Sequence, residues 1–260
     1  MDIRQSDRYA RYLKSLGWKG EKAGNANVFI RRLPFFPFLS VIKIQRPTSL
    51  DFSALEGLRK KYHAVLTKIE PDRSSLLARS PFRPDNWPLL PTKTLILDLD
   101  KITLNKDIRY EIRKAGNLQV TESKDPERFY KMLQETMKIG HWSVPIKREV
   151  VNLWQSFQPD NSAILLTPVS GCLLIWEGDT AHYMYAANTA EGRKGGAAYL
   201  TLWETLQFCR KKKLKFLDLE GIYDERYPSS TKTWQGFTAF KKQWGGKVVE
   251  YPGSFTRRAF

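Results

Sequence analysis

The chain has 260 residues, enough for one large domain or for two small domains with a core each. Hydrophobic residues make up 42% and aromatic residues 13%, so the composition excludes an intrinsically disordered protein. The 43 Lys and Arg outnumber the 27 Asp and Glu, which gives a net charge of +16. This charge favours a nucleic-acid partner, with anionic lipid head groups or solubility alone as the alternatives.

The basic excess is concentrated at the two ends of the chain. Residues 1–50 carry ten basic and three acidic residues, residues 201–260 carry twelve and six, and residues 151–200 carry two and four. Both cysteines, Cys172 and Cys209, lie in apolar runs without a C-x-x-C pair, which indicates a reduced interior and no zinc site. The start lacks the apolar core of a signal peptide, and no run is long enough to span a bilayer. We therefore expect a cytoplasmic protein.

The first eighty residues mix helical and extended patterns. Apolar residues at helical spacing predict a helix over residues 6–17, with Ser6 as its N-cap and Gly17 as its end. The same reasoning predicts further elements: strands over 27–33, 39–45 and 63–70, and a helix over 49–62.

The segment Ser80–Pro91 is expected to be an extended connector between two domains. It contains four prolines, which fix φ and remove backbone donors. We therefore divide the chain into a first domain, 1–92, and a second domain, 93–246. The tail 247–260 is a segment that can return to the first domain.

After the connector, the pattern runs from helices to an antiparallel meander and back. The expected helices cover 104–116, 125–140, 146–157, 195–213 and 231–246, and the expected strands cover 93–100, 162–168, 172–177, 182–187, 215–222 and 247–253. This order predicts an α+β fold with mixed, largely antiparallel sheets. It is also the order of an acyltransferase domain of the GNAT (acyl-CoA N-acyltransferase) type.

A short motif precedes the helix over 195–213. Arg193, Gly196 and Ala198 fit the pattern R-x-x-G-x-A between a strand and a helix. Free N–H groups at a helix start can hold an anion, and in GNAT enzymes this pattern holds the pyrophosphate of CoA. A glycine-rich helix start with an exposed arginine is the equally weighted alternative.

The last eighty residues resemble the FemABX family of aminoacyl-tRNA-dependent peptidyltransferases, and its FemX-like members in particular. Tyr183 and Tyr185 form the Y-x-Y strand, and a helix and the D-L-x-G-I strand ending at Ile222 follow. Phe240 and Lys241 are the first two residues of a run that resembles the F-K-x-x-F motif on the next helix of that family. The centre, from Thr94 on, resembles the L-D-L strand and the basic helix of that family. This resemblance implies two GNAT-like domains, one before and one after the connector.

The resemblance implies roles for individual residues. Lys241 matches the lysine that stabilises charge on the reacting carbonyl, and Phe240 matches a residue whose backbone carbonyl lies at the acceptor amine. Tyr185, with Tyr183, matches the acceptor contact. Trp18 and Lys22 match a W-x-x-x-K element whose lysine binds the diphosphate of a nucleotide substrate, as a compact ammonium can. Arg193 and Gly196 complete the substrate-binding candidates near the helix start.

The sequence departs from the family pattern in two places. Glu220 stands where the family has glycine, and its carboxylate is a candidate general base for the acceptor amine or a partner of Lys241. The family arginine before the helix over 146–157 is not kept, and Lys147 or Arg148 is the candidate replacement for the diphosphate contact.

Two basic segments are candidate tRNA surfaces, unless they are solvated helix faces. They comprise Lys106, Arg109, Arg113 and Lys114 on one helix, and Lys211, Lys212 and Lys213 at the end of another. The histidines, His63, His141 and His182, are expected to be isolated, so we predict no metal site.

The resemblance implies an aminoacyltransferase that uses aminoacyl-tRNA as co-substrate and needs no cofactor. Its acceptor would be the stem peptide of UDP-MurNAc-peptide or lipid II, reached by a cytoplasmic monomer, with the inner face of the membrane as a possible contact. Two alternatives stay open: an acyl-CoA-dependent N-acyltransferase, and a basic nucleic-acid-binding module without catalysis. A related ligase acting on a small metabolite or peptide outside the wall is a further variant.

Overall fold

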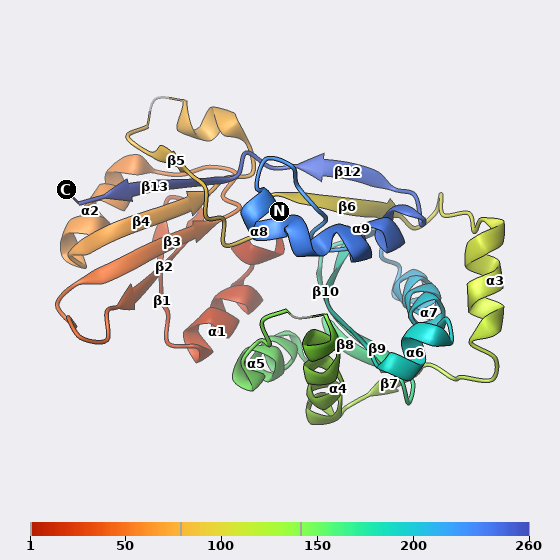
Figure 1. Ribbon diagram of the computed structural model, residues 1–260. Coiled ribbons are helices and arrows are strands. Elements are labelled where there is room, and N and C mark those ends of the chain that lie inside the picture. Colours follow the sequence, from red (N-terminus) through yellow and green to blue (C-terminus); the bar gives the residue numbers. More distant parts are fainter. Residues whose placement is uncertain (1, 79, 141, 260) are drawn as a thin grey trace. The chain divides into compact units, whose positions relative to one another are not determined.

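The computed structural model describes residues 2–78, 80–140 and 142–259 (Figure 1). The described residues form two compact units. Unit 1 comprises the chain up to Lys93, Asp224–Lys232, and the residues from Glu250 on, and unit 2 comprises Thr94–Tyr223 and Thr233–Val249. The division after Lys93 lies one residue from the boundary predicted at 92, and residues 224–232, which we had placed in the second domain, group with unit 1.

Unit 1 is built on a six-stranded sheet. The strand order is β1-β2-β3-β4-β13-β5, with β3 and β4 parallel and the other neighbouring pairs antiparallel. Its elements are η1 (Ile3–Gln5), α1 (Asp7–Ser15), β1 (Lys19–Ala23), β2 (Ala26–Arg32), β3 (Ser40–Gln45), α2 (Phe52–Lys61), β4 (Ala64–Glu70), η2 (Ser74–Leu77), β5 (Arg83–Asp85), α8 (Pro228–Thr231) and β13 (Ser254–Arg258).

Local chemistry explains why the predicted elements of unit 1 form. The Ser6 hydroxyl caps α1 by accepting from the backbone N of Tyr9, and Gly17, at φ +87°, follows the helix end. Val28 and Ile30 on β2 share a buried cluster with Ile42 on β3. Burying each such side chain contributes roughly 1.5–3 kcal/mol. Three strands, β1, β5 and β13, were not predicted, because their sequences lack a clear apolar alternation.

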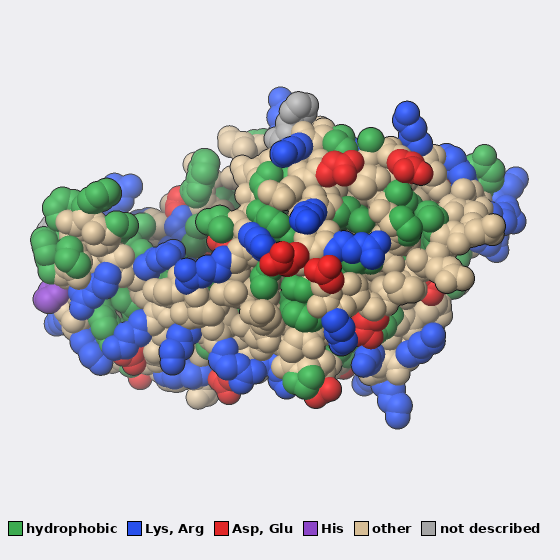
Figure 2. All heavy atoms as spheres, turned by 90° about the horizontal axis from the view of Figure 1, so that it is seen from below, with side chains coloured by type: hydrophobic (Ala, Val, Ile, Leu, Met, Phe, Trp, Pro, Cys, Tyr) green, Lys and Arg blue, Asp and Glu red, His purple; other side chains and the backbone are tan. Residues whose placement is uncertain are grey.

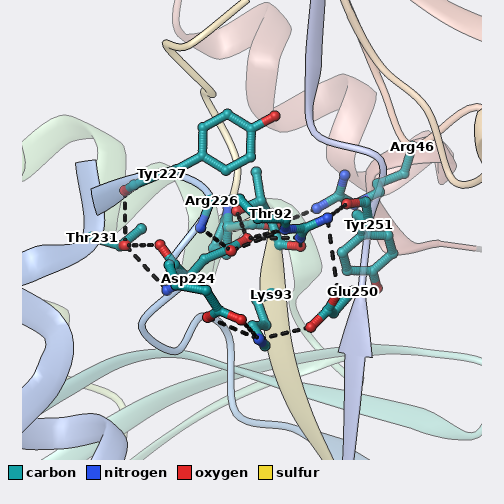
Figure 3. A network of polar contacts seen from close by, with 11 residues as sticks. Arg46, Thr92, Lys93, Asp224, Arg226, Tyr227, Thr231, Glu250 and Tyr251 are labelled. Carbon is teal, nitrogen blue, oxygen red and sulfur yellow. Dashed lines mark hydrogen bonds and ion pairs between the residues drawn. The ribbon is translucent and has the colours of Figure 1, made fainter. Parts of the chain in front are cut away.

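A polar network joins Asp224 and the residues around it to Thr92 and Lys93 (Figure 3). Asp224 accepts hydrogen bonds from the Thr92 hydroxyl and from the Arg226 guanidinium. Lys93 lies between the carboxylates of Glu225 and Glu250, at 2.9 and 2.7 Å. These bonds connect the segment that begins at Asp224 to Thr92 and Lys93, whereas the C-terminal strand β13 belongs to unit 1 because it pairs with β4 and β5.

Unit 2 is built on a seven-stranded sheet of order β12-β6-β11-β10-β9-β8-β7. β10 and β11 are parallel, and the pairs β6–β11, β10–β9, β9–β8 and β8–β7 are antiparallel. Its elements are β6 (Lys93–Asp98), α3 (Lys106–Lys114), β7 (Thr121–Ser123), α4 (Pro126–Ile139), α5 (Lys147–Phe157), β8 (Ser162–Leu166), β9 (Ser170–Glu177), β10 (Thr180–Asn188), α6 (Ala190–Lys194), α7 (Ala197–Lys211), β11 (Phe216–Asp218), η3 (Lys232–Trp234), α9 (Gln235–Lys242) and β12 (Lys247–Glu250).

Helices contact the sheet of unit 2 through alternating strand residues. On one face, Leu202 and Leu206 of α7 share a core cluster with Cys172 and Leu174 of β9. Helices α4 and α5 also contact β8 and β9. The α+β class with two mixed, largely antiparallel sheets is therefore confirmed. No helix within the described residues is both long enough and apolar enough to cross a bilayer.

Positive φ values limit two of the predicted elements of unit 2. The strand over 215–222 ends at Asp218, because Glu220 and Gly221 adopt positive φ values of +50° and +80°. The helix over 231–246 is replaced by η3 and α9 after Thr231, the last residue of α8, and it ends before Gly245 and Gly246, both of which have positive φ.

Candidate functional site

The parallel strands of unit 2 separate beside His182 and Asp218. These residues form the last pair in the register between β10 and β11. Beyond it, β10 has a register shift between Tyr183 and Tyr185, which indicates a β-bulge. β11 ends at Asp218, and the chain turns away through Glu220. Polar side chains therefore collect where the two strands diverge.

His182 is bonded to Glu220 at this point. Its Nδ1 lies 2.7 Å from Oε1 of Glu220 and 4.0 Å from Oδ2 of Asp218. Asp218 accepts hydrogen bonds from the Thr94 hydroxyl and from the backbone N of Glu220. Burial raises the pKa of the Asp218 carboxyl, and the nearby Glu220 charge adds to this.

The expectation that His182 is isolated is therefore wrong, because the parallel pairing of β10 with β11 brings distant residues together. His63 is exposed, and His141 lies outside the described residues. Within the described residues, His182, Asp218 and Glu220 have ligand-type atoms within 4.8 Å of one another. However, 2.7 Å is a hydrogen-bond distance, and the Lys241 charge lies close by. The absence of a metal site stays a prediction.

Lys241 extends from α9 to the turn that follows β11. Its Nζ donates to the backbone oxygens of Leu219, Glu220 and Gly221, at 2.5, 3.0 and 2.7 Å. These three bonds match the three donors of an ammonium group. Burial lowers the pKa of Lys241 to about 8, and the charges of Asp218 and Glu220 oppose this shift.

This geometry changes one of the two roles considered for Glu220. The carboxylate of Glu220 is bonded to His182, whereas Lys241 contacts the backbone oxygen of Glu220. The expected side-chain pairing of Glu220 with Lys241 is thus replaced by a pairing with His182, because the positive φ of Glu220 directs its carbonyl to the lysine.

The chain is similar to known proteins over the segment that contains this site. The model of the FemAB family matches residues 146–259, which include β10, β11 and α9. The chain is 25% identical over 223 residues to the lipid II:glycine glycyltransferase of Staphylococcus epidermidis, covering 82% of this chain and 51% of that protein. The chain thus spans about half the length of the curated relatives that it matches.

Solved structures show the same fold. A crystal structure of FemX superposes with a TM-score of 0.80 at 16% identity, covering 99% of this chain and 92% of that one. The chain thus resembles the FemABX family in sequence over residues 146–259 and resembles FemX in fold.

A GCN5-related N-acetyltransferase from Kribbella flavida superposes with a TM-score of 0.52 at 12% identity, covering 98% of this chain and 95% of that one. The fold of the two sheets is therefore similar to that of a GNAT enzyme, as predicted.

Phe240 is fixed by an aromatic cluster. Its ring lies 4.9 Å from that of Tyr199 on α7 and 6.3 Å from that of Trp244. One turn earlier on α9, Phe237 lies 4.7 Å from the Lys241 Nζ. These aromatic contacts hold α9, and with it Lys241, in place within unit 2.

The two tyrosines of the Y-x-Y strand are not brought together. Tyr183 is buried in the core beside Cys172, and burial raises the pKa of its hydroxyl well above the usual value. Tyr185 is half-buried and pairs with Leu173, whereas Tyr183 pairs with Leu174. Because side chains alternate along β9, the bulge directs the two tyrosines to opposite faces.

The remaining substrate-binding candidates of unit 2 lie at its surface. Lys147 is exposed and forms an ion pair with Glu127 at 2.8 Å, and Arg148 is exposed. Arg193 donates to the backbone oxygen of Thr136. The substrate-binding roles of these three side chains stay predictions.

Gly196 has a structural requirement of its own. It caps α7 with φ +73°, and a Cβ at this position would lie 2.3 Å from the backbone oxygen of Glu111. The Glu111 carboxylate also lies beside this helix start, 3.2 Å from the same position. An acidic side chain there disfavours a pyrophosphate at the α7 N-terminus, so the geometry argues against the CoA cradle.

Trp18 and Lys22 belong to unit 1. The Trp18 ring is flanked by the cations of Lys43 and Arg31, at 4.2 and 5.4 Å, and Lys22 is exposed on β1. The ring therefore lies within a basic part of the first sheet, which suits contact with a phosphate.

The predicted tRNA-binding side chains are exposed on two helices that contact each other, α3 and α7. They are Lys106, Arg109, Arg113 and Lys114 on α3, and Lys211, Lys212 and Lys213 at the end of α7. Lys114 has an ion pair with Glu111, and Lys212 lies over the Phe208 ring at 5.5 Å. The structure thus gathers both basic segments within unit 2.

Sequence reasoning missed Asp218, His182 and Thr94 as members of the site. It also missed a cavity of about 700 Å³ in unit 2, lined in part by Asp98, Lys101, Asn105, Gln243 and Trp244. The D-L-E-G-I run was a usable signal for Asp218, because a carboxylate inside an apolar strand requires buried partners.

Proposed function

We propose that this chain is an aminoacyltransferase, which moves an amino acid from aminoacyl-tRNA to the stem peptide of a peptidoglycan precursor. The observation that carries the proposal is the FemAB family match over residues 146–259, which contains Glu220, Phe240 and Lys241. Similarity to a protein named lipid II:glycine glycyltransferase supports a wall precursor, UDP-MurNAc-peptide or lipid II, as acceptor.

The chemistry is the aminolysis of an ester. The acceptor amine forms a C–N bond to the carbonyl carbon, the C–O bond to the tRNA breaks, and the tRNA hydroxyl leaves with a proton. The amine must lose a proton, and the carbonyl oxygen gains negative charge in the transition state. The donor ester is already activated, so no covalent enzyme intermediate and no cofactor are needed.

The site offers a group for each of these charges. The Glu220–His182 pair can accept the proton from the amine, because a carboxylate and an imidazole that are bonded to each other can share that proton. Lys241 supplies positive charge and holds the turn at 219–221 in place. The three N–H donors of Lys241 already bond backbone carbonyls. Lys241 therefore acts on the reacting oxygen either through its electrostatic field or by giving up one of these hydrogen bonds and bonding that oxygen instead.

The basic helices α3 and α7 supply the proposed tRNA contact. Seven exposed Lys and Arg side chains on them attract phosphates, so tRNA binding should weaken steeply with salt. We further propose a monomer that works in the cytoplasm, peripheral to the inner face of the membrane.

The proposal is tested by incubating the protein with charged tRNAs and either UDP-MurNAc-pentapeptide or lipid II. The expected result is an acceptor whose mass increases by one amino acid, only when the tRNA is charged. Lys241→Ala should abolish the increase, and Lys242→Ala, which changes the exposed neighbour, should preserve it. No mass increase, together with thermal stabilisation by acetyl-CoA, would instead indicate a CoA-dependent acyltransferase.

A further inference from the structure

The loop between β2 and β3 exposes an unusual amount of aromatic surface. Phe35, Phe36 and Phe38 are 90%, 53% and 61% exposed. The loop also contains Pro34 and Pro37, which lack N–H donors. Exposed aromatic residues that gather in one place mark an interaction surface more often than isolated ones do.

This loop is ordered by its own hydrogen bonds. The backbone N of Leu33 donates to the Leu39 oxygen at 3.1 Å, and the N of Leu39 donates to the Phe36 oxygen at 2.8 Å. Arg32 donates to the Phe38 oxygen at 2.9 Å. The Phe36 and Phe38 rings contact edge to face, with centroids 6.1 Å apart. The three phenylalanines are thus presented by a closed turn.

The sheet topology places basic residues at the same end of unit 1. Ser40, directly after the loop, pairs with Ala64 at the start of β4, and Arg258 near the end of β13 pairs with Leu66. Helix α2 ends just before β4. The exposed cations that this arrangement gathers around the loop are Arg31, Arg32, Lys60, Lys61 and Arg258. Figure 2 shows hydrophobic side chains at the left edge of the view, with Lys and Arg side chains beside them.

We infer that this end of unit 1, the Phe35–Phe38 loop with its surrounding cations, binds the surface of a bilayer that contains anionic lipids. Aromatic side chains insert into the region between head groups and acyl chains, and cations pair with the phosphates. The two prolines reduce the number of backbone donors that would lose water on insertion. A second copy is a poor occupant, because two identical basic surfaces would repel each other.

This inference does not depend on the proposed transfer reaction, because membrane binding can be measured without any substrate. If both hold, they favour a lipid-linked acceptor over a soluble one.

The test is cosedimentation with vesicles of phosphatidylcholine, with and without phosphatidylglycerol. We expect the protein to bind the anionic vesicles and to bind less as salt is raised. The triple variant Phe35→Ser, Phe36→Ser, Phe38→Ser should lose roughly a hundredfold in partitioning. Trp87→Ser is the matched control, because Trp87 is 68% exposed and its backbone oxygen bonds Lys68, towards the opposite end of β4.

A labelled residue reports insertion directly. Phe36→Cys carrying a polarity-sensitive fluorophore should shift to the blue with anionic vesicles, whereas Trp87→Cys should not. The native Cys172 and Cys209 should not react, because burial raises the pKa of both thiols to about 12. The inference is overturned if the wild type does not bind vesicles, or if the triple variant binds equally well. It is also overturned if the wild type is a dimer that the triple variant converts to a monomer, since the loop is then a protein contact.

Discussion

Each unit contains a parallel pair of neighbouring strands: β3 with β4 in unit 1, and β10 with β11 in unit 2. Both pairs end in buried ionisable residues. In unit 1, the pair ends at Gln45 and Glu70, and Arg46 follows, only 2% exposed. In unit 2, the pair ends at His182 and Asp218, with Glu220 and Lys241 beside them.

The chain of unit 1 itself occupies the end of its parallel pair. Arg46 stacks on the Tyr251 ring at 3.5 Å and donates to the backbone oxygen of Pro91. Figure 3 shows Arg46 and Tyr251 lying against each other. Glu70 accepts hydrogen bonds from the backbone N atoms of Leu89 and Leu90. Main-chain groups thus hold both charges, and no proton needs to move.

The end of the parallel pair in unit 2 is different, because two titratable side chains bond each other there. A proton can pass between His182 and Glu220, and a buried ammonium fixes the adjacent turn. Buried charge alone therefore does not distinguish the proposed site from the end of the parallel pair in unit 1. What distinguishes the two ends is whether the partner is a backbone group or another titratable side chain.

Replacing Lys241 should have the largest effect of any single change. Lys241→Ala leaves three buried carbonyls without their shared donor, which should lower the free energy of unfolding by about 3–5 kcal/mol. Amino-acid transfer should fall below detection. Urea denaturation and the transfer assay measure the two effects separately. Lys242→Ala should stay within about 0.5 kcal/mol of the wild type, and equal losses in both variants would remove the special role of Lys241.

Replacing Arg46 tests the end of the parallel pair in unit 1. Arg46→Leu should cost roughly 3 kcal/mol of unfolding free energy, because Glu70 stays buried with less compensating charge. Transfer per folded molecule should not change. Arg83→Leu, on exposed β5, is the control and should cost at most about 0.5 kcal/mol. A loss of turnover in folded Arg46→Leu would show that this end of unit 1 also contributes to the reaction.

Replacing Glu220 tests the proton-accepting pair. Glu220→Gln keeps the shape and removes the charge, so the transfer rate should fall by about 10- to 100-fold. His182→Asn should cause a similar loss. If the two side chains act as one unit, the double variant should be no slower than the slower single variant. Multiplied losses in the double variant, or an unchanged rate in Glu220→Gln, would contradict a shared proton.

Regular elements with strong periodicity were predictable from the sequence. The cap at Ser6 and the apolar faces of α4 and α7 mark their helices clearly, and the meander of β8, β9 and β10 follows from its apolar runs. Strands β1 and β13 were not predictable, because Lys and Arg occupy many of their positions and only pairing to neighbours makes them strands.

The candidate site was only partly predictable. Lys241 and Glu220 could be named because they lie in a run that resembles a family motif. Their partners could not, since the bond from Glu220 to His182 depends on a parallel pairing of two strands and on a positive φ at a non-glycine residue. The helical pattern of α9 likewise does not show which groups the Lys241 ammonium contacts.

The pH dependence of Lys241 separates the effect of its charge on stability from its effect on transfer, and these are the smallest effects that we expect. Its pKa is about 8 in the folded protein, below the ordinary value of 10.5, so the folded state loses this proton first as pH rises. Between pH 8 and 10.5 the unfolded state therefore binds more protons, and this group's contribution to the free energy of unfolding should rise by up to a few kcal/mol. Transfer should instead fall above pH 8, because the positive charge disappears. Wild type and Lys241→Met, compared by denaturation across this range and by wild-type rate profiles, measure both trends. A rate that keeps rising above pH 9 would show that the reaction does not use the charge of Lys241.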